Sequence, residues 1–170
     1  MRKAITLYLM ILSYSAFADP TIFGMELGKT TEKDLKSIYN VSHTGINKYS
    51  NGNMYSVPVA SIDFDGLKEV TTIFSMDGNL VAVVTKLQKG KFDYLHKLLG
   101  DKYKLVSQQI AFVGDKKATY RDGATEISLD EPHMSFDMSM SYINDDLMQA
   151  FNQKSQAEIR QNQQSEGSQL

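Results

Sequence analysis

The sequence contains no cysteine, which excludes disulfide bonds, a lipid anchor on cysteine and catalysis by a thiol nucleophile. Histidine is also scarce. The three histidines are His43, His96 and His133, and no two of them have the four-residue spacing that brings two zinc ligands together on a helix. We therefore expect neither a metal site nor a cofactor.

Long apolar runs are missing after the first residues, so we expect no segment that spans a membrane. The first eighteen residues have the pattern of a signal peptide. Arg2 and Lys3 precede the short apolar run 4–12, and Ala16-Phe17-Ala18 is a typical cleavage site. This pattern predicts export to the periplasm and a mature chain that begins near Asp19.

An excess of basic residues is missing too. The chain has 18 Lys and Arg against 20 Asp and Glu, and removal of Arg2 and Lys3 with the signal leaves a net charge of −4. A mildly acidic protein has no basic face for nucleic acid and no electrostatic attraction to anionic lipid. The charge of the chain therefore gives no reason to expect either kind of partner.

What remains is enough chain for one domain whose core holds without disulfides. We expect a single α+β domain over residues 19–151. Residues 152–170 are rich in Gln and Ser, and only Ile159 offers them an apolar anchor. This composition predicts a frayed helix or a disordered tail.

The clearest structural pattern is a hairpin over Leu67–Leu87. Two β-rich runs flank Asp77-Gly78, a dipeptide that accepts the positive φ angles of a tight turn. The predicted cross-strand pairs are Glu69–Lys86, Val70–Thr85, Thr71–Val84, Thr72–Val83, Ile73–Ala82 and Phe74–Val81. Both faces carry apolar residues, which indicates a strand pair inside a larger sheet.

Three helices are predicted. Thr31 and Asp34 resemble a capping box, and the helix that follows is expected to bury Leu35, Ile38 and Tyr39 on one face. A second helix spans 91–99 and ends at Gly100. Asn144 is the expected cap of the third.

Further strands follow from turn signals and alternation. Asn51-Gly52 is a second hairpin turn, which places Tyr49 opposite Met54. The other predicted strands cover residues 60–64, 103–113, 117–121, 124–129 and 134–142. A helix followed by strands in each half of the chain indicates an α+β fold, with two short helices packed on an antiparallel sheet of meanders.

Residues Gly24–Leu35, GMELGKTTEKDL, together with this order of elements, resemble the small envelope domains typified by BamE/SmpA and the β-lactamase inhibitor protein. Those domains begin with a glycine-containing turn, a threonine-capped helix and a meander. The resemblance implies a function in binding other proteins, as an inhibitor or as an assembly accessory.

Patterns that suggest chemistry are incomplete. Gly24-x-x-x-Gly28-Lys29-Thr30 has one residue too few between its glycines for a P-loop, and we interpret it as the turn before the first helix. Asp63-Phe64-Asp65-Gly66 is only a fragment of a calcium loop. No serine lies in a G-x-S-x-G elbow. The acids at turns are Asp63, Asp65, Asp122, Asp130 and Glu131, and a carboxylate pair of the glycosidase kind stays open as an alternative.

Two stretches are candidate binding surfaces. The segment 48–56, KYSNGNMYS, combines rigid aromatic and small polar residues as binding loops do, and its candidate binding residues are Tyr49, Asn51, Met54 and Tyr55. The alternative is an ordinary hairpin tip. The second stretch is the alternating stripe Met134, Phe136, Met138, Met140 and Tyr142, which is either the core face of an interior strand or a contact face.

The resulting hypothesis is a periplasmic, non-enzymatic protein that binds another envelope protein. One alternative is a carrier that holds an apolar or envelope-derived small molecule between the sheet and the helices. Another is a hydrolase that uses paired carboxylates. The sequence leaves the partner and the oligomeric state open.

Overall fold

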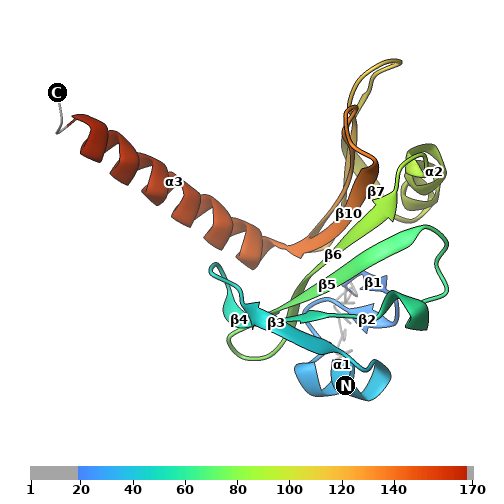
Figure 1. The fold of residues 1–170 in the computed structure, drawn as a ribbon, viewed down its shortest axis with the longest axis horizontal. Helices are drawn as coiled ribbons and strands as arrows, with labels where there is room; N and C mark the ends of the chain where they lie inside the picture. Colours follow the sequence, from blue (N-terminus) through green and yellow to red (C-terminus); the bar gives the residue numbers. More distant parts are fainter. Residues whose placement is uncertain (1–18, 168–170) are drawn as a thin grey trace, which may run out of the picture.

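An antiparallel sheet of eight strands forms the body of the protein in the computed structural model (Figure 1). The structure describes residues 19–167, so the predicted signal peptide over residues 1–18 lies outside the described part of the chain. The strands are β3 (Ser42–Ile46), β4 (Asn51–Ser56), β5 (Leu67–Ser75), β6 (Leu80–Gln88), β7 (Lys104–Ile110), β8 (Lys116–Asp122), β9 (Thr125–Glu131) and β10 (Asp137–Asn144). Across the sheet their order is β3-β4-β5-β6-β10-β9-β8-β7.

The helices and a small hairpin complete an α+β fold, the class that the sequence predicts. They are α1 (Glu32–Ile38), α2 (Phe92–Lys102), α3 (Asp145–Gly167), a 3-10 turn at Val59–Ser61, and the hairpin of β1 (Thr21–Ile22) and β2 (Met25–Glu26). Along the chain α1 precedes β3 to β6, and α2 precedes β7 to β10. The last strands of these two sets, β6 and β10, pair antiparallel at the centre of the sheet.

The predicted central hairpin is confirmed over five of its six pairs. The register of β5 and β6 runs from Glu69↔Lys86 to Ile73↔Ala82, and the Lys86 Nζ lies 2.9 Å from Glu69 Oε1. The sixth pair is wrong, because a register shift beside the turn sets Phe74 opposite Leu80 instead of Val81. Phe74 is nevertheless fully buried.

The first helix begins as predicted. The Thr31 hydroxyl accepts from the Asp34 amide, and the Asp34 carboxylate accepts from the Thr31 amide, which completes a capping box. Leu35 is fully buried, but Ile38 is 51% exposed. Tyr39 is half-buried at the C-cap and packs against the core, so the predicted apolar face is wrong at Ile38.

The turn predicted at Asn51-Gly52 is wrong. The chain reverses at residues 47–50, where Asn47 Oδ1 accepts from the amides of Tyr49 and Ser50, and Gly45 lies opposite Met54. Gly52 serves a different purpose. A Cβ atom at this position would lie 2.1 Å from the Phe74 carbonyl oxygen, so glycine allows β4 to approach β5.

Other boundaries also move. The predicted strand over 60–64 is a 3-10 turn and a loop, because Pro58 ends β4 and caps that turn. The second helix continues through Gly100 to Lys102, since Gly100 keeps a helical φ. The strand predicted over 103–113 ends at Ile110, and the strand predicted from Met134 begins at Asp137. The third helix has the predicted cap, with Asn144 Oδ1 accepting from the Asp146 amide at 2.7 Å.

The core lies between one face of the sheet and the layer made by α1, α2 and the β1–β2 hairpin. One register row crosses the buried face through Tyr55, Thr72, Val83, Tyr142, Ile127 and Tyr120. All six side chains are buried. Helices α1 and α2 reach the two halves of this row through Glu32–Tyr55 and His96–Tyr120 contacts, respectively.

The two outer strands of the sheet are irregular. The register of β3 against β4 shifts between His43 and Gly45, and that of β7 against β8 shifts between Leu105 and Ser107. Such shifts are β-bulges, which bend a strand and increase its twist.

Candidate functional site

The sheet face turned away from α1 and α2 carries a transverse row of hydroxyl side chains. Seven of the eight strands contribute one, and the row reads Ser42, Ser56, Thr71, Val84, Ser141, Ser128, Thr119 and Ser107 in strand order. We call these seven hydroxyl residues the hydroxyl band. Every one of them is exposed or half-buried.

The band differs from the threonines on the buried face. There, Thr72 donates its hydroxyl to the Tyr55 carbonyl, and Thr85 donates to the Met140 carbonyl. Within residues 19–167, no hydroxyl of the band makes a hydrogen bond to another protein group. The hydroxyls of the band are thus available as donors and acceptors for water or for a bound molecule.

The rows on either side of the band have different chemistry. One contains two cross-strand ion pairs: Lys86 with Glu69 at 2.9 Å, and Lys117 with Asp130 at 3.2 Å. The other begins with apolar Met54, Ile73, Ala82 and Ile143. The same row then ends in Glu126 and Arg121. The uncovered face therefore offers a charged row, a row of short hydroxyls and a partly apolar row side by side.

The structure does not bring the four predicted binding residues to one surface. Tyr55 is only 5% exposed and its hydroxyl donates to Glu32 Oε2 at 2.5 Å, so its ring belongs to the buried face. Met54 lies on the uncovered face, half-buried, where its sulfur accepts from Asn47 Nδ2. Asn51 is exposed at the start of β4 with a φ of 55°.

Tyr49 meets the third helix. Its ring packs edge-on against Phe151 of α3 at 4.9 Å, and Lys48 Nζ lies 4.7 Å from the centre of the Tyr49 ring. Lys48 also pairs with Glu158 at 3.2 Å, and Lys154 donates to the Lys48 carbonyl. Lys48 and Tyr49 at the tip of the β3–β4 hairpin therefore hold α3 against the sheet.

The first turns of α3 cover one corner of the uncovered face. A cavity of about 240 Å³ lies between this helix and the sheet, and it is lined by Asn47, Tyr49, Ile73, Ile143, Leu147, Met148 and Phe151. Beyond this corner, α3 projects away from the sheet (Figure 1). The hydroxyl band is not among the residues that line this cavity.

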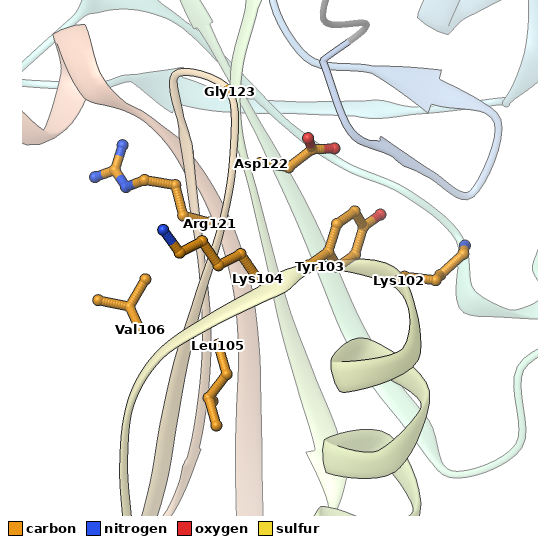
Figure 2. A pocket seen from close by; sticks show the side chains of 8 residues that line it. All are labelled: Lys102, Tyr103, Lys104, Leu105, Val106, Arg121, Asp122 and Gly123. Atoms are coloured by element: carbon orange, nitrogen blue, oxygen red, sulfur yellow. The ribbon is translucent and has the colours of Figure 1, made fainter.

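An open pocket of about 560 Å³ lies at the opposite edge of the sheet, and Figure 2 shows the residues that line it. Three of them are cationic: Lys102, Lys104 and Arg121. Figure 2 shows that the side chains spread in different directions, with Arg121 and Val106 on one side and Lys102 on the other. Arg121 is also held by Asp145, both of whose carboxylate oxygens lie 2.8 Å from Nη1. The pocket does not gather its charges on one point.

A second cleft, of about 450 Å³, lies between the β1–β2 hairpin and α2. Its lining is mostly apolar and includes Ile22, Phe23, Phe64, Leu95, Leu98 and Leu99. Met140 and Tyr142 of the buried sheet face reach its floor. This cleft offers room between α2 and the buried face of the sheet.

Three of the five acids at turns have protein partners. Asp65 pairs with Lys91, Asp130 pairs with Lys117, and the buried Glu131 accepts from the Gly90 amide at 2.8 Å. The three carboxyls with a resolved shift, Glu32, Asp34 and Asp65, all have lowered pKa values, whereas a general acid needs a raised one. Across residues 19–167 no three His, Asp or Glu side chains form a group that could hold a metal ion.

His96 and the glycine turn have structural partners. His96 is half-buried, stacks on Phe92 and has its Nδ1 against the Tyr120 hydroxyl, while burial raises the pKa of Tyr120 to about 12. The Gly28 amide donates to the Leu80 carbonyl and the Thr30 amide to the Glu26 carbonyl. With these amides engaged, the turn before α1 has no cradle for a phosphate.

The methionine-rich stripe divides into two parts. Met138, Met140 and Tyr142 lie on β10 and are buried in the core. Met134 and Phe136 lie in the loop before β10, and each is 91% exposed. The core interpretation is therefore confirmed for the three residues on β10, and it is wrong for Met134 and Phe136.

Comparisons of the chain with models of known protein families, with curated proteins and with solved structures found no match. Over residues 19–167, no helix combines the length and the apolar character needed to cross a membrane. Sequence reasoning missed the hydroxyl band. The serines and threonines of the band are visible in the sequence, but only the register of all eight strands puts them in one row.

Proposed function

We propose that this chain is an exported, non-enzymatic protein-binding module that docks a partner protein on the uncovered face of its sheet. The observation that carries the proposal is the hydroxyl band, which crosses the sheet with seven hydroxyls that make no hydrogen bond to the described protein. Export rests on the signal pattern of residues 1–18.

The chemistry of the band suits a protein partner. Serine and threonine lose little rotamer freedom when they are covered, and each hydroxyl can donate or accept. Short side chains also let the main chain of a partner approach the sheet. The adjoining ion pairs, Lys86–Glu69 and Lys117–Asp130, add a charge pattern that fixes orientation more than it adds affinity.

Site-specific photocrosslinking tests this proposal. A photoreactive amino acid replaces Ser141 or Ser128 at the centre of the band, and Ser37 on the exposed side of α1 is the matched control. In the cells that make this protein, we expect the two band positions to yield the same discrete protein adduct and Ser37 to yield none. Equal adducts at all three positions, or none at Ser141 and Ser128, would contradict docking on the band.

A second candidate function is favoured by the cleft between the β1–β2 hairpin and α2. Its volume of about 450 Å³ and its apolar lining fit a small apolar molecule, as a carrier requires. Native mass spectrometry of the protein taken from its own cells would detect a bound compound. Leu98, which is 40% exposed at this cleft, gives the control: Leu98→Arg should release a ligand that binds there.

A further inference from the structure

Four large apolar side chains are exposed together at one end of the sheet. Phe112 and Val113 occupy the β7–β8 loop and are 104% and 70% exposed, and Met134 and Phe136 occupy the β9–β10 loop at 91% each. Figure 1 shows this end of the sheet opposite to α1, where the β7–β8 hairpin projects from the body. We call these four residues the apolar tip.

The two loops are tied together, so the apolar side chains stand on a defined backbone. Asp115 Oδ1 of the first loop accepts from the His133 amide of the second at 2.7 Å. Lys89, at the end of β6, donates its ammonium to the carbonyl oxygens of Pro132 and His133 at 2.9 and 2.6 Å. Single exposed apolar residues need no explanation, but a patch of them marks a surface that binds something.

The shape of the apolar tip favours a lipid bilayer over a protein as the partner. The described pockets and clefts do not include Phe112, Val113, Met134 or Phe136 among their lining residues. The four side chains are 70–104% exposed on their loops, so they do not enclose a hollow among themselves. A protein partner would need a hollow of matching shape, whereas the interface of a bilayer accepts projecting apolar side chains of any arrangement.

The charges around the tip fit the same partner. The nearby acids are turned to other groups: Asp115 to the His133 amide, Glu131 to the Gly90 amide, and Asp137 to Lys68. Lys89 contacts only carbonyl oxygens, and no carboxylate of residues 19–167 pairs with it. Lys89 thus lies against the loop that carries Met134 and Phe136, where lipid phosphates would lie if those side chains were inserted.

We propose that the protein binds the surface of a lipid bilayer by inserting the apolar tip between the headgroups. The attraction is apolar, so it does not conflict with the net negative charge of the chain. Because the tip is at an end of the sheet and the hydroxyl band crosses its face, a molecule held at the membrane in this way keeps the band free.

Sedimentation with vesicles tests the proposal. The probes are vesicles of phosphatidylcholine and vesicles of phosphatidylethanolamine with phosphatidylglycerol, and all protein samples are matched for N-terminus by intact mass. The test variant combines Phe112→Ser with Phe136→Ser. The control is Met76→Ser, which removes a 77% exposed apolar side chain from the β5–β6 turn.

We expect the wild type and the Met76→Ser variant to sediment with both kinds of vesicle, with little dependence on salt. The double variant should lose at least about tenfold in its partition coefficient, since two large apolar groups leave the interface. Absence of wild-type binding, equal binding of the double variant, or loss in the control would overturn the proposal. So would a dimer in analytical ultracentrifugation that needs the tip while vesicles bind nothing, because a second copy would then be the partner.

A fluorescence experiment checks depth and does not depend on the first readout. The sequence contains no tryptophan, so Phe112→Trp introduces a single probe at the tip, and Ile46→Trp introduces a matched one on β3, at a site 67% exposed. Vesicles should shift the emission of the tip probe to the blue and allow brominated lipid to quench it. The β3 probe should not respond. An unchanged tip spectrum in the presence of vesicles would contradict insertion.

Discussion

Single aromatic residues in this protein differ sharply in what they do, although the sequence presents them alike. Phe74 is fully buried beneath Tyr55, with the two ring centres 5.8 Å apart, whereas Phe112 is fully exposed. We expect Phe74→Ala to lower the free energy of unfolding by about 3–5 kcal/mol, since it leaves a cavity in the core. Chemical denaturation measures this.

Phe112→Ala is the matched control, and we expect its effect to stay within about 0.5 kcal/mol of the wild type. If the two variants were equally stable, the assignment of the core would be wrong.

Glu32 links α1 to the sheet and gives the protein a pH-dependent contact. Burial raises its pKa, but the hydrogen bonds from Tyr55 and Asn53 and the charge of Lys36 outweigh burial, so the folded-state pKa lies below the usual value. A lowered pKa means that the charged form stabilises the fold. This contribution is fully present above the pKa of the unfolded state and is lost as the pH falls through the folded-state pKa.

We therefore expect Glu32→Gln to be less stable than the wild type at pH 7, and the difference to shrink as the pH falls below about 4. Denaturation midpoints of both proteins across this range measure it. The variant Tyr55→Phe, which removes one hydrogen bond to Glu32, should show a smaller effect of the same sign. A difference that is constant with pH would show that the carboxylate charge of Glu32 contributes nothing.

At the scale of the elements, two glycines have opposite requirements. A Cβ atom on Gly52 would lie 2.1 Å from the Phe74 carbonyl oxygen, whereas a Cβ atom on Gly100, inside α2, would meet nothing within 4 Å. We expect Gly52→Ala to separate β4 from β5 and to lower the melting temperature strongly. Gly100→Ala should raise stability by about 0.5–1 kcal/mol, because glycine is a poor helix former. Thermal melts of the two variants decide this, and the same sign for both would contradict the structure.

The third helix is a long element with few supports. Leu147 is its buried anchor, Phe151 packs on Tyr49, and Glu158 pairs with Lys48. Truncation after Gln156 removes only the last of these contacts, an ion pair between side chains that are both more than half exposed. We expect a loss of less than about 1 kcal/mol. Circular dichroism and denaturation of the truncated chain measure it, and a molten product would show that the distal helix supports the domain.

How far the sequence predicts these elements depends on how local their causes are. The capping box of Thr31 and Asp34 and the position of the turn between β5 and β6 are decided by neighbouring residues, and both were predicted, although the pairing beside that turn was not. The turn at residues 47–50 was not, because Gly52 is required by a contact with β5 and not by its own turn. The error in the turn also led to the prediction that Tyr55 belongs to a binding loop. Its burial follows from register with Thr72, which the pattern around Asn51-Gly52 does not reveal.

At the scale of the whole molecule, the proposed export determines the residue at which the mature chain begins. The motif Ala16-Phe17-Ala18 predicts a mature protein that begins at or near Asp19. Intact-mass measurement of the protein from the periplasmic fraction checks this. A full-length mass, or recovery of the protein from the cytoplasm, would contradict export and with it the choice of an envelope partner.

The bulges in the two outer strands affect whether copies of the protein associate at high concentration. A regular free edge offers its main-chain groups to any other strand, and here the edges belong to different strands, β3 and β7. Joining one edge to the other is a head-to-tail contact, which builds a fibril whenever it does not close into a ring. The register shifts at His43–Gly45 and Leu105–Ser107 interrupt the regular row of main-chain groups on both edge strands. We expect the protein to remain as separate particles at concentrations where an evenly hydrogen-bonded sheet of this width would polymerise.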